Sequence, residues 1–523
     1  MDPRIREDDG QSQALTMATV LCVWEQGGNL GHLSNLRLPI EIALQLGHRV
    51  VLAARELHRV PEALGGLRIE LLPAPFKQNV QPADQSAFLS FTHILARQCF
   101  SSVAELEMYL RAWSCIFDLV EPDLVLYDHS PTALVASHGR PFKKVSVGSG
   151  FYNPPAPGPG APFAPFSTTA LTPEVLTRLA IDEAQVLGMV NQARANLTLA
   201  PLAALADLYH QLDERLFLTW PELDHFGVRP GQRYLGNQAL AVHPAAVWPA
   251  VRGPKVFGYL QNMPSLEALL RDLRASGVCA LLWVNDLPPK LRQAYTSERL
   301  QFLSQLVDLS SVATQAHWAI CHANHSTACT LMLAGLPQLL IPRHQEQLLL
   351  ARRLVAQGSA LLAYQDQPGY AKEINALLTN PTLRTNATAL AHSCRQRGEP
   401  DAKGYIRAAL TSLLVEVSPY NVGTVITLMS PMLTSNTLHP TKLIAIGNSK
   451  GIRLPQALLR RYGLGDQIML EERPEGLLLR GAVSAKVSLK QTFAEMAQEQ
   501  AAMVEDWSDL AAAEADGLDT LKW

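Results

Sequence analysis

Apolar runs of strand length alternate with amphipathic runs of helix length through most of the chain. Strands are predicted at ATVLCVW (18–24), HRVVLAA (48–54), PDLVLYD (122–128) and KKVSVGSG (143–150). Between the first two, LSNLRLPIEIALQL (33–46) has the apolar spacing of a helix, and a glycine follows it. This alternation is typical of a parallel sheet covered by helices.

A second series with the same alternation begins near Lys255. Strands are predicted at KVFGYL, CALLWV, HWAIC and PQLLIP, and helices around 265–275, 297–306 and 327–333. The two series predict two consecutive α/β units. A less regular, helix-rich region lies between them at 151–235 and opens with the Pro-rich NPPAPGPGAPFAPF.

The pattern ends near Val417. Residues 416–439 have neither period and are predicted to be a linker, whereas 440–482 have short apolar runs and tight turns without a crossover helix. Residues 441–480 carry seven Lys or Arg against four Asp or Glu, but 484–523 carry three against eight, so the charge balance reverses. We therefore expect a different small domain at 440–482, followed by an acidic tail at 483–523.

The expected organisation has six parts. They are a disordered N-terminus (1–17), an N-terminal domain (18–235), a second α/β domain (236–415), the linker (416–439), the small domain (440–482) and the acidic tail (483–523).

Composition narrows the class of protein. The chain has 523 residues and a formal net charge of -3, so any contact with nucleic acid must be local rather than a property of the whole surface. Its seven cysteines never occur as CxxC, which favours reduced thiols and a cytoplasmic protein. The longest uncharged stretches are interrupted by Pro, Gly, Ser and Asn, so no membrane span is predicted.

The first candidate site follows the first strand, at the turn GGNLGHL. His32 lies at the start of the predicted helix, and Asp128 ends another predicted strand. Both would reach the carboxyl edge of the sheet, where open α/β folds bind ligands. There His32 could act as a general base and Asp128 could fix its tautomer. The alternative is that His32 is only a residue of the helix cap.

The second candidate site follows the strands of the second unit. His322 comes after HWAIC, Ser326 and Thr327 stand where the next helix would start, and Glu346 and Gln347 come after PQLLIP. The start of a helix suits a phosphate group. No Cys or carboxylate completes a metal-ligand set at a usable spacing, so a phosphate site is predicted and a metal site is not.

The motifs of residues 18–415 resemble those of glycosyltransferase family 1, the nucleotide-sugar-dependent enzymes of the GT-B fold. The resemblance rests on GHLSNL, Gly47-His48, YDHSPTAL, TWPELDHFG, KVFGYL, HANHST and AGLPQLLIPRHQEQ. It implies two Rossmann-like domains, with a hydroxyl acceptor (a small molecule or lipid-linked) held by the first and a UDP-sugar or dTDP-sugar held by the second. No cofactor and no metal ion are implied, and the transfer would invert the anomeric carbon.

The same resemblance implies a role for each candidate residue. His32 would deprotonate the acceptor and Asp128 would orient it. His322, Ser326 and Thr327 would hold the diphosphate, while Glu346 and Gln347 would take hydroxyl groups of the donor sugar.

The signature also departs from the family pattern. Ala323 and Asn324 stand where two glycines are usual, and Thr330 stands where a glutamate usually grips the ribose. No aromatic residue that would stack on the base is evident upstream. A catalytically inactive nucleotide-sugar-binding protein therefore remains the alternative.

Residues 440–482 resemble a second family, the MazE/AbrB/SpoVT type of swapped-hairpin β-barrel, in which a strand, the GNSKGIRLP turn, a short helix and a final hairpin follow one another. The resemblance implies a homodimer that binds DNA through residues near this turn, which are Lys442, Asn448, Ser449, Lys450 and Arg453. The acidic tail would bind a MazF-like toxin ribonuclease, or it is a solvated or disordered segment. An antitoxin joined to a neighbouring glycosyltransferase reading frame would also explain the chain.

Overall fold

The computed structural model divides the chain into two compact units, Met1–Gly423 and Thr424–Trp523. In the first unit the structure describes residues 17–28, 30–76, 88–98, 100–155, 158, 161–166, 171–237 and 244–415. In the second it describes the backbone of 443–446, 449–452, 468–473 and 476–481. Each unit is considered by itself.

The first unit begins with a six-stranded sheet in the order β3-β2-β1-β4-β5-β6, in which every neighbouring pair is parallel. Its strands are β1 (Thr19–Trp24), β2 (Arg49–Ala54), β3 (Glu70–Pro73), β4 (Leu124–Asp128), β5 (Lys143–Gly148) and β6 (Glu214–Phe217). This is the strand order of a doubly wound dinucleotide-binding fold. The four strands predicted here from the sequence are confirmed.

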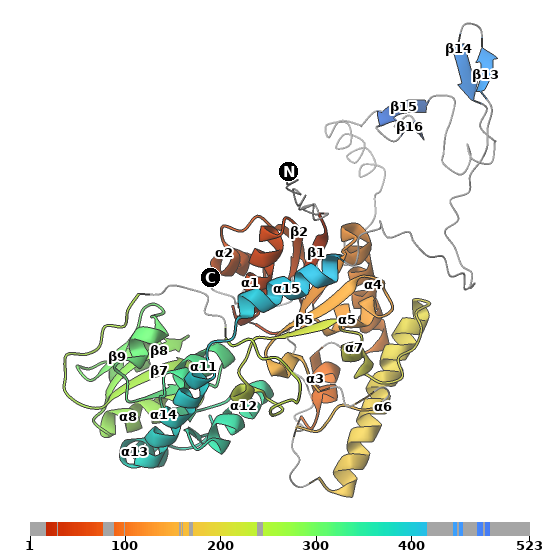
Figure 1. Ribbon diagram of the computed structural model, residues 1–523. Helices are drawn as coiled ribbons and strands as arrows, with labels where there is room; N and C mark the ends of the chain where they lie inside the picture. The colour runs from red at the N-terminus through yellow and green to blue at the C-terminus, as the bar shows by residue number, and fades with distance from the viewer. Residues whose placement is uncertain are drawn as a thin grey trace, which may run out of the picture. The chain divides into compact units, whose positions relative to one another are not determined.

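Helices and short turns connect these strands (Figure 1). They are α1 (Gly31–Gln45), η1 (Leu57–Arg59), α2 (Val60–Leu64), α3 (Phe91–Gln98), α4 (Val103–Val120), α5 (Pro131–Ser137), η2 (Gly150–Tyr152), α6 (Pro173–Asn196), α7 (Asp207–His210) and η3 (Pro221–Leu223). Leu21 and Val23 pack into one apolar cluster, and Val20, Cys22 and Trp24 pack into another. Strand β1 is therefore buried on both faces, as its continuous apolar run requires.

A second six-stranded parallel sheet follows, in the order β12-β11-β10-β7-β8-β9. Its strands are β7 (Lys255–Gln261), β8 (Cys279–Asn285), β9 (Leu300–Phe302), β10 (Trp318–Cys321), β11 (Gln338–Leu340) and β12 (Ala360–Leu362). The helices of this part are α8 (Leu266–Ala275), α9 (Pro289–Tyr295), α10 (Leu309–Ala313), α11 (His325–Leu333), α12 (Gln345–Ala356), α13 (Ala371–Thr379), α14 (Pro381–Gln396) and α15 (Ala402–Val415). We call the parts built on the two sheets the first half and the second half of this unit.

The helix predicted around 297–306 is wrong. Residues 300–302 form β9, which pairs with β8 so that Leu300 lies opposite Ala280, and the helix of this connection is α9, which ends at Tyr295. Leu300 is buried by this pairing. Three residues of strand are too few for a periodicity to distinguish them from helix.

Helix α15 packs against the first half, although it follows the second half in the sequence. Ile406 and Leu410 are fully buried in the cluster that also holds Val20 and Trp24 of β1, and α15 lies along α1 (Figure 1). The end of the first unit therefore returns to the first sheet. The expected boundary at 415 follows the order of the chain and not this packing.

The described strands of the second unit form two antiparallel hairpins. Strand β13 (Leu443–Ile446) pairs with β14 (Ser449–Ile452), and β15 (Ile468–Arg473) pairs with β16 (Gly476–Gly481). Part of the expected GNSKGIRLP turn is thus the strand β14. The expected helix, the barrel and the positions of Lys442, Asn448 and Arg453 lie outside the described residues, and of Ser449 and Lys450 only the backbone is described.

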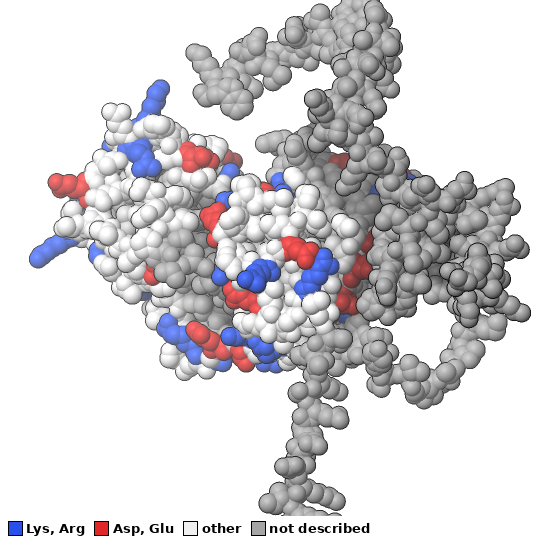
Figure 2. All heavy atoms as spheres, turned by 90° about the horizontal axis from the view of Figure 1, so that it is seen from above, with Lys and Arg blue, Asp and Glu red and all other residues white. Residues whose placement is uncertain are grey.

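Charges of both signs are interspersed on the face of the first unit seen in Figure 2, with no broad area of one sign among the described residues. No helix in the described ranges is long and apolar enough to cross a membrane.

Candidate active site

His32 and Asp128 meet at the point where the first sheet reverses its strand order. Strands β1 and β4 are neighbours, with Trp24 opposite Asp128, and His32 is the second residue of the helix that follows β1. The Nδ1 atom of His32 lies 2.7 Å from Oδ1 of Asp128, and both side chains are buried. The sequence placed both residues at this edge, and the structure brings them into contact.

The carboxylate of Asp128 is held on both sides. Its Oδ2 accepts a hydrogen bond of 2.9 Å from the Asn35 side chain, one turn of α1 after His32. Gly148, at the end of β5, adopts a φ of +131°, and a Cβ there would come within 3.3 Å of Asn35 and 3.8 Å of Asp128. A glycine at this strand end leaves the room that the two side chains occupy.

The other ring nitrogen of His32 faces the turn after β1. A Cβ on Gly27, where φ is +81°, would stand 2.2 Å from His32 Nε2. The turn therefore passes directly against Nε2, and only a glycine allows this approach. With Nδ1 donating to Asp128, Nε2 carries the lone pair that can accept a proton.

The pKa of His32 is set by opposing effects. Burial lowers it, but the negative charge of Asp128 and the hydrogen bond to it raise it, and so does the charge of Glu346, so that the net direction is upward from 6.5. The positive charge of Arg55 acts in the opposite direction. A base with these neighbours is well suited to take a proton near neutral pH.

Tyr152 connects the first half to the second. Its hydroxyl donates a hydrogen bond of 2.8 Å to Oε2 of Glu346, which lies in the first turn of α12. Its ring centroid lies 5.0 Å from that of His32 and 4.1 Å from that of His129. Burial, and then the charge of Glu346, raise the pKa of the Tyr152 hydroxyl well above 10, which keeps it a donor. Tyr152 therefore contacts both Glu346 and His32.

His322 lies at the corresponding reversal point of the second sheet, directly after β10. Its Nδ1 lies 2.7 Å from the carbonyl oxygen of Ile341, and its Nε2 accepts the backbone N–H of Gln261 at 2.8 Å. The ring therefore joins the ends of β7 and β11, and both nitrogens already have partners. Burial lowers its pKa, which keeps the ring neutral.

The remaining candidates of the second half lie around the start of α11. Ser326 is exposed and Thr327 is buried in its first turn, after Ala323, which has a φ of +63°. The Gln347 amide donates to Asn324 Oδ1 at 2.5 Å and accepts the Arg343 N–H at 2.8 Å. Ser326, Thr327, Glu346 and Gln347 thus come from two neighbouring helix starts.

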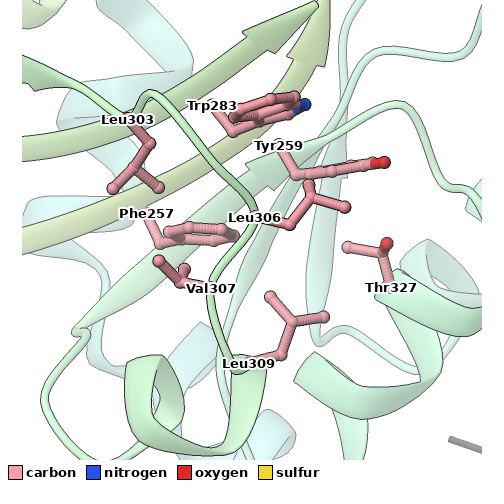
Figure 3. Close-up of a pocket in the computed structure, with 8 residues that line it drawn as sticks. All are labelled: Phe257, Tyr259, Trp283, Leu303, Leu306, Val307, Leu309 and Thr327. Atoms are coloured by element: carbon pink, nitrogen blue, oxygen red, sulfur yellow. The ribbon is translucent and has the colours of Figure 1, made fainter. Parts of the chain in front are cut away.

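An apolar cavity of about 150 Å³ lies beside Thr327 (Figure 3). Phe257 and Tyr259 line it from β7 and Trp283 from β8, where Trp283 lies opposite Tyr259 in the strand pairing. Four aliphatic side chains from the segment after β9 line the rest: Leu303, Leu306, Val307 and Leu309. A site of this size with aromatic walls fits one planar ring system.

Sequence reasoning missed these aromatic residues, since it found no aromatic residue upstream that would stack on the base. The signal was present, since Phe257 and Tyr259 are two residues apart in a strand and therefore share a face. Tyr152 gave no signal, because its partner Glu346 is distant in the sequence. Among the described residues no group of three or more His, Cys, Asp or Glu is placed to hold a metal ion.

Solved structures resemble this chain. The glycosyltransferase of kitacinnamycin matches with a TM-score of 0.53 and 16% identity, over 76% of this chain and 99% of its own. CalG4, the calicheamicin glycosyltransferase, matches with 0.55 and 15%, over 77% and 100%. The spinosyn rhamnosyltransferase SpnG complexed with spinosyn aglycone matches with 0.51 and 17%, over 75% and 100%. The first unit has the GT-B fold. This confirms the fold expected for it.

At these identities the likeness concerns the fold and not the activity. No family model matches the sequence, and no curated protein matches it. The GT-B fold places the carboxyl edges of two sheets at one cleft, which agrees with the hydrogen bond from Tyr152 in the first half to Glu346 in the second.

Replacing Asp128 by Asn should lower the pKa of His32, because the charge that raises it is lost while the burial that lowers it stays. Histidine NMR titration of the full-length protein measures this directly. Asp118→Asn, on the exposed surface of α4, is the matched control and should leave the value unchanged. An unaltered His32 titration in Asp128→Asn would contradict the account of the pair.

The same shift has a consequence for stability. Because the folded-state pKa of His32 lies above its ordinary value of about 6.5, the stability gained is full below that pH and is lost as pH rises through the folded pKa. Asp128→Asn should weaken this pH dependence.

Proposed function

We propose that the first unit is a glycosyltransferase that moves a sugar from a nucleoside diphosphate to a hydroxyl group with inversion and without a metal ion. The observation that carries the proposal is the buried His32–Asp128 pair, in which Nδ1 of His32 lies 2.7 Å from Asp128 and the charge of Glu346, from the second half, also acts on the ring. A base on one half opposite polar groups on the other is what such a transfer needs.

In this proposal His32 Nε2 takes the proton of the acceptor hydroxyl as the oxygen attacks the anomeric carbon. The bond from that carbon to the diphosphate oxygen breaks on the opposite side, so the configuration inverts. Asp128 stabilises the imidazolium through Nδ1. The charge that develops on the leaving diphosphate is taken by backbone N–H groups at the start of α11, with the Ser326 and Thr327 hydroxyls.

The donor is proposed to lie along the second half. The aromatic cavity of Tyr259 and Trp283 would take the base of a UDP-sugar or dTDP-sugar, and Thr327, at its edge, would lead to the diphosphate. Glu346 would take a sugar hydroxyl in exchange for Tyr152, and Gln347 would do so in exchange for Asn324. His322 would act through the loop it holds, since both of its nitrogens have backbone partners.

The alternative, an inactive nucleotide-sugar-binding protein, is favoured by the altered signature. Ala323 occupies a backbone conformation that favours glycine, and the Thr330 hydroxyl is already bonded to the Ser326 carbonyl. The intact pair of His32 and Asp128 favours catalysis instead. Transfer activity distinguishes the two.

The expected result of His32→Ala is a loss of transfer of about a hundred- to ten-thousand-fold, with donor affinity nearly unchanged, because the base acts on the acceptor. Product formation with a UDP- or dTDP-sugar, together with donor calorimetry, measures both quantities. Gly27→Ala should have a comparable effect by pushing against Nε2, whereas Gly28→Ala, whose Cβ would meet nothing within 4 Å, should not. Full activity in His32→Ala would refute the assignment of the base.

We propose a second function for the second unit, DNA binding as a homodimer. The proposal rests on the resemblance of residues 440–482 to the MazE/AbrB/SpoVT type, and the described residues of this stretch form two hairpins, β13 with β14 and β15 with β16. The excess of positive charge in 441–480 suits phosphate contacts, with Asn448 as a candidate for base contacts. A toxin ribonuclease remains the proposed partner of the acidic tail.

Arg453→Ala should reduce specific binding of the full-length protein to DNA from its own upstream region. Gel shifts at increasing salt measure this, because phosphate contacts weaken as salt rises. Arg407→Ala in α15 of the first unit is the control and should leave binding unchanged. Wild-type protein that does not prefer this DNA to random sequence would rule out the DNA-binding function.

A further inference from the structure

Arg55 is a buried cation at the edge of the proposed acceptor site. It follows β2 directly, and its backbone N–H donates 3.0 Å to the carbonyl oxygen of Trp24, whose ring stacks on His32 with centroids 5.6 Å apart. Its side chain is 9% exposed. No sequence motif singles out this residue, and the proposed chemistry does not use it.

The charge of Arg55 is only partly compensated. Its Nε and Nη1 atoms are buried and have no hydrogen-bond partner among the described residues. The nearest carboxylate oxygen recorded for it among the described residues, Glu56 Oε1, lies 3.5 Å from Nε, well beyond the roughly 2.7–2.9 Å of a charged hydrogen bond. Glu56 also faces Arg59, at 3.7 Å, so one carboxylate serves two guanidinium groups.

A buried guanidinium with unused donors is costly unless a partner arrives. The Phe76 ring lies 4.8 Å from its central carbon and covers one face, which leaves the N–H groups of Nε and Nη1 to point to acceptors in the guanidinium plane. Nε and Nη1 lie on different edges of the guanidinium, so each can donate to one oxygen of a carboxylate or phosphate. We propose that Arg55 binds an anionic group of the acceptor, so that the acceptor class is hydroxy acids or hydroxylated phosphate esters.

This inference rests on the proposed function, and it connects the charge of Arg55 with the basicity of His32. The positive charge of Arg55 lowers the pKa of both His32 and His129, which opposes proton uptake by the base. An acceptor that carries its own negative charge to Arg55 removes this opposition when it binds. A neutral acceptor would leave the base weaker.

The anion that binds Arg55 could also be the diphosphate of the donor. The position of Arg55 in the first half favours an anionic group of the acceptor instead. Arg55 follows β2 beside Trp24 and the base, all in the first half. Arg59 lies in the same segment, and its charge lowers the pKa of Tyr259, which lines the aromatic cavity of the second half. Arg59→Gln is therefore a matched control that removes a neighbouring charge on the donor side.

The test uses the full-length protein and compounds that differ only in charge. We would titrate para-hydroxybenzoate against para-hydroxybenzamide, and an omega-hydroxy fatty acid against its amide, by calorimetry. In at least one pair the wild type should bind the acid more than about tenfold more tightly than the amide, a preference worth about 1.4 kcal/mol. Arg55→Gln should abolish that preference, Arg55→Lys should keep part of it, and Arg59→Gln should keep all of it.

UDP and dTDP titrations separate the two proposals. Nucleotide affinity within about twofold of wild type in Arg55→Gln supports the acceptor role, whereas weaker nucleotide binding with an unchanged acid preference assigns Arg55 to the diphosphate and overturns the inference. Equal affinity for acid and amide in both pairs, or no binding of either acid, also overturns it while leaving sugar transfer intact. Acid preference without any nucleotide binding would instead remove the proposed transfer and keep the Arg55 site.

Discussion

The hydrogen bond between His32 and Asp128 depends on the parallel pairing of β1 with β4. That pairing sets Trp24 opposite Asp128, and α1 begins a few residues later, so the imidazole and the carboxylate arrive at the same edge from opposite sides of the reversal point. Both groups are buried, and removing either would leave the other without its partner, which typically costs about 1–3 kcal/mol or more for a charged group. The glycines at 27 and 148 and the amide of Asn35 are arranged around this one contact.

The second half repeats the topology with a different use of its histidine. His322 follows β10, which corresponds to β4 rather than to β1, and it bonds to backbone groups at the ends of the two strands on either side of β10. The polar groups left for a ligand are those at the starts of α11 and α12, beside the aromatic cavity. In the proposed transfer the two sheets therefore have different parts: the base follows the first sheet, and the polar and aromatic groups for a donor follow the second.

Much of this could be predicted from the sequence. Buried parallel strands have continuous apolar runs, and the side chains that follow them must share an edge, so β1, β4 and the pair His32 and Asp128 followed directly. The prediction of short elements failed, because the three residues of β9 are too few to show a periodicity. Contacts between distant segments could not be predicted either. The packing of α15 on the first sheet, the bond from Tyr152 to Glu346, and the environment of the Arg55 side chain depend on tertiary packing that no local pattern encodes.

The central claim is that the second half binds a nucleoside diphosphate sugar opposite the His32 base. It is tested most directly by the unfolding temperature of the full-length protein with UDP-, dTDP- and GDP-sugars, and of Trp283→Ala under the same conditions. At about 100 times its Kd, a donor should add about 2.7 kcal/mol of stability, and the added stability should shrink in Trp283→Ala because one wall of the cavity is lost. No stabilisation by any of the three nucleotide classes, or equal stabilisation in the variant, would contradict the account.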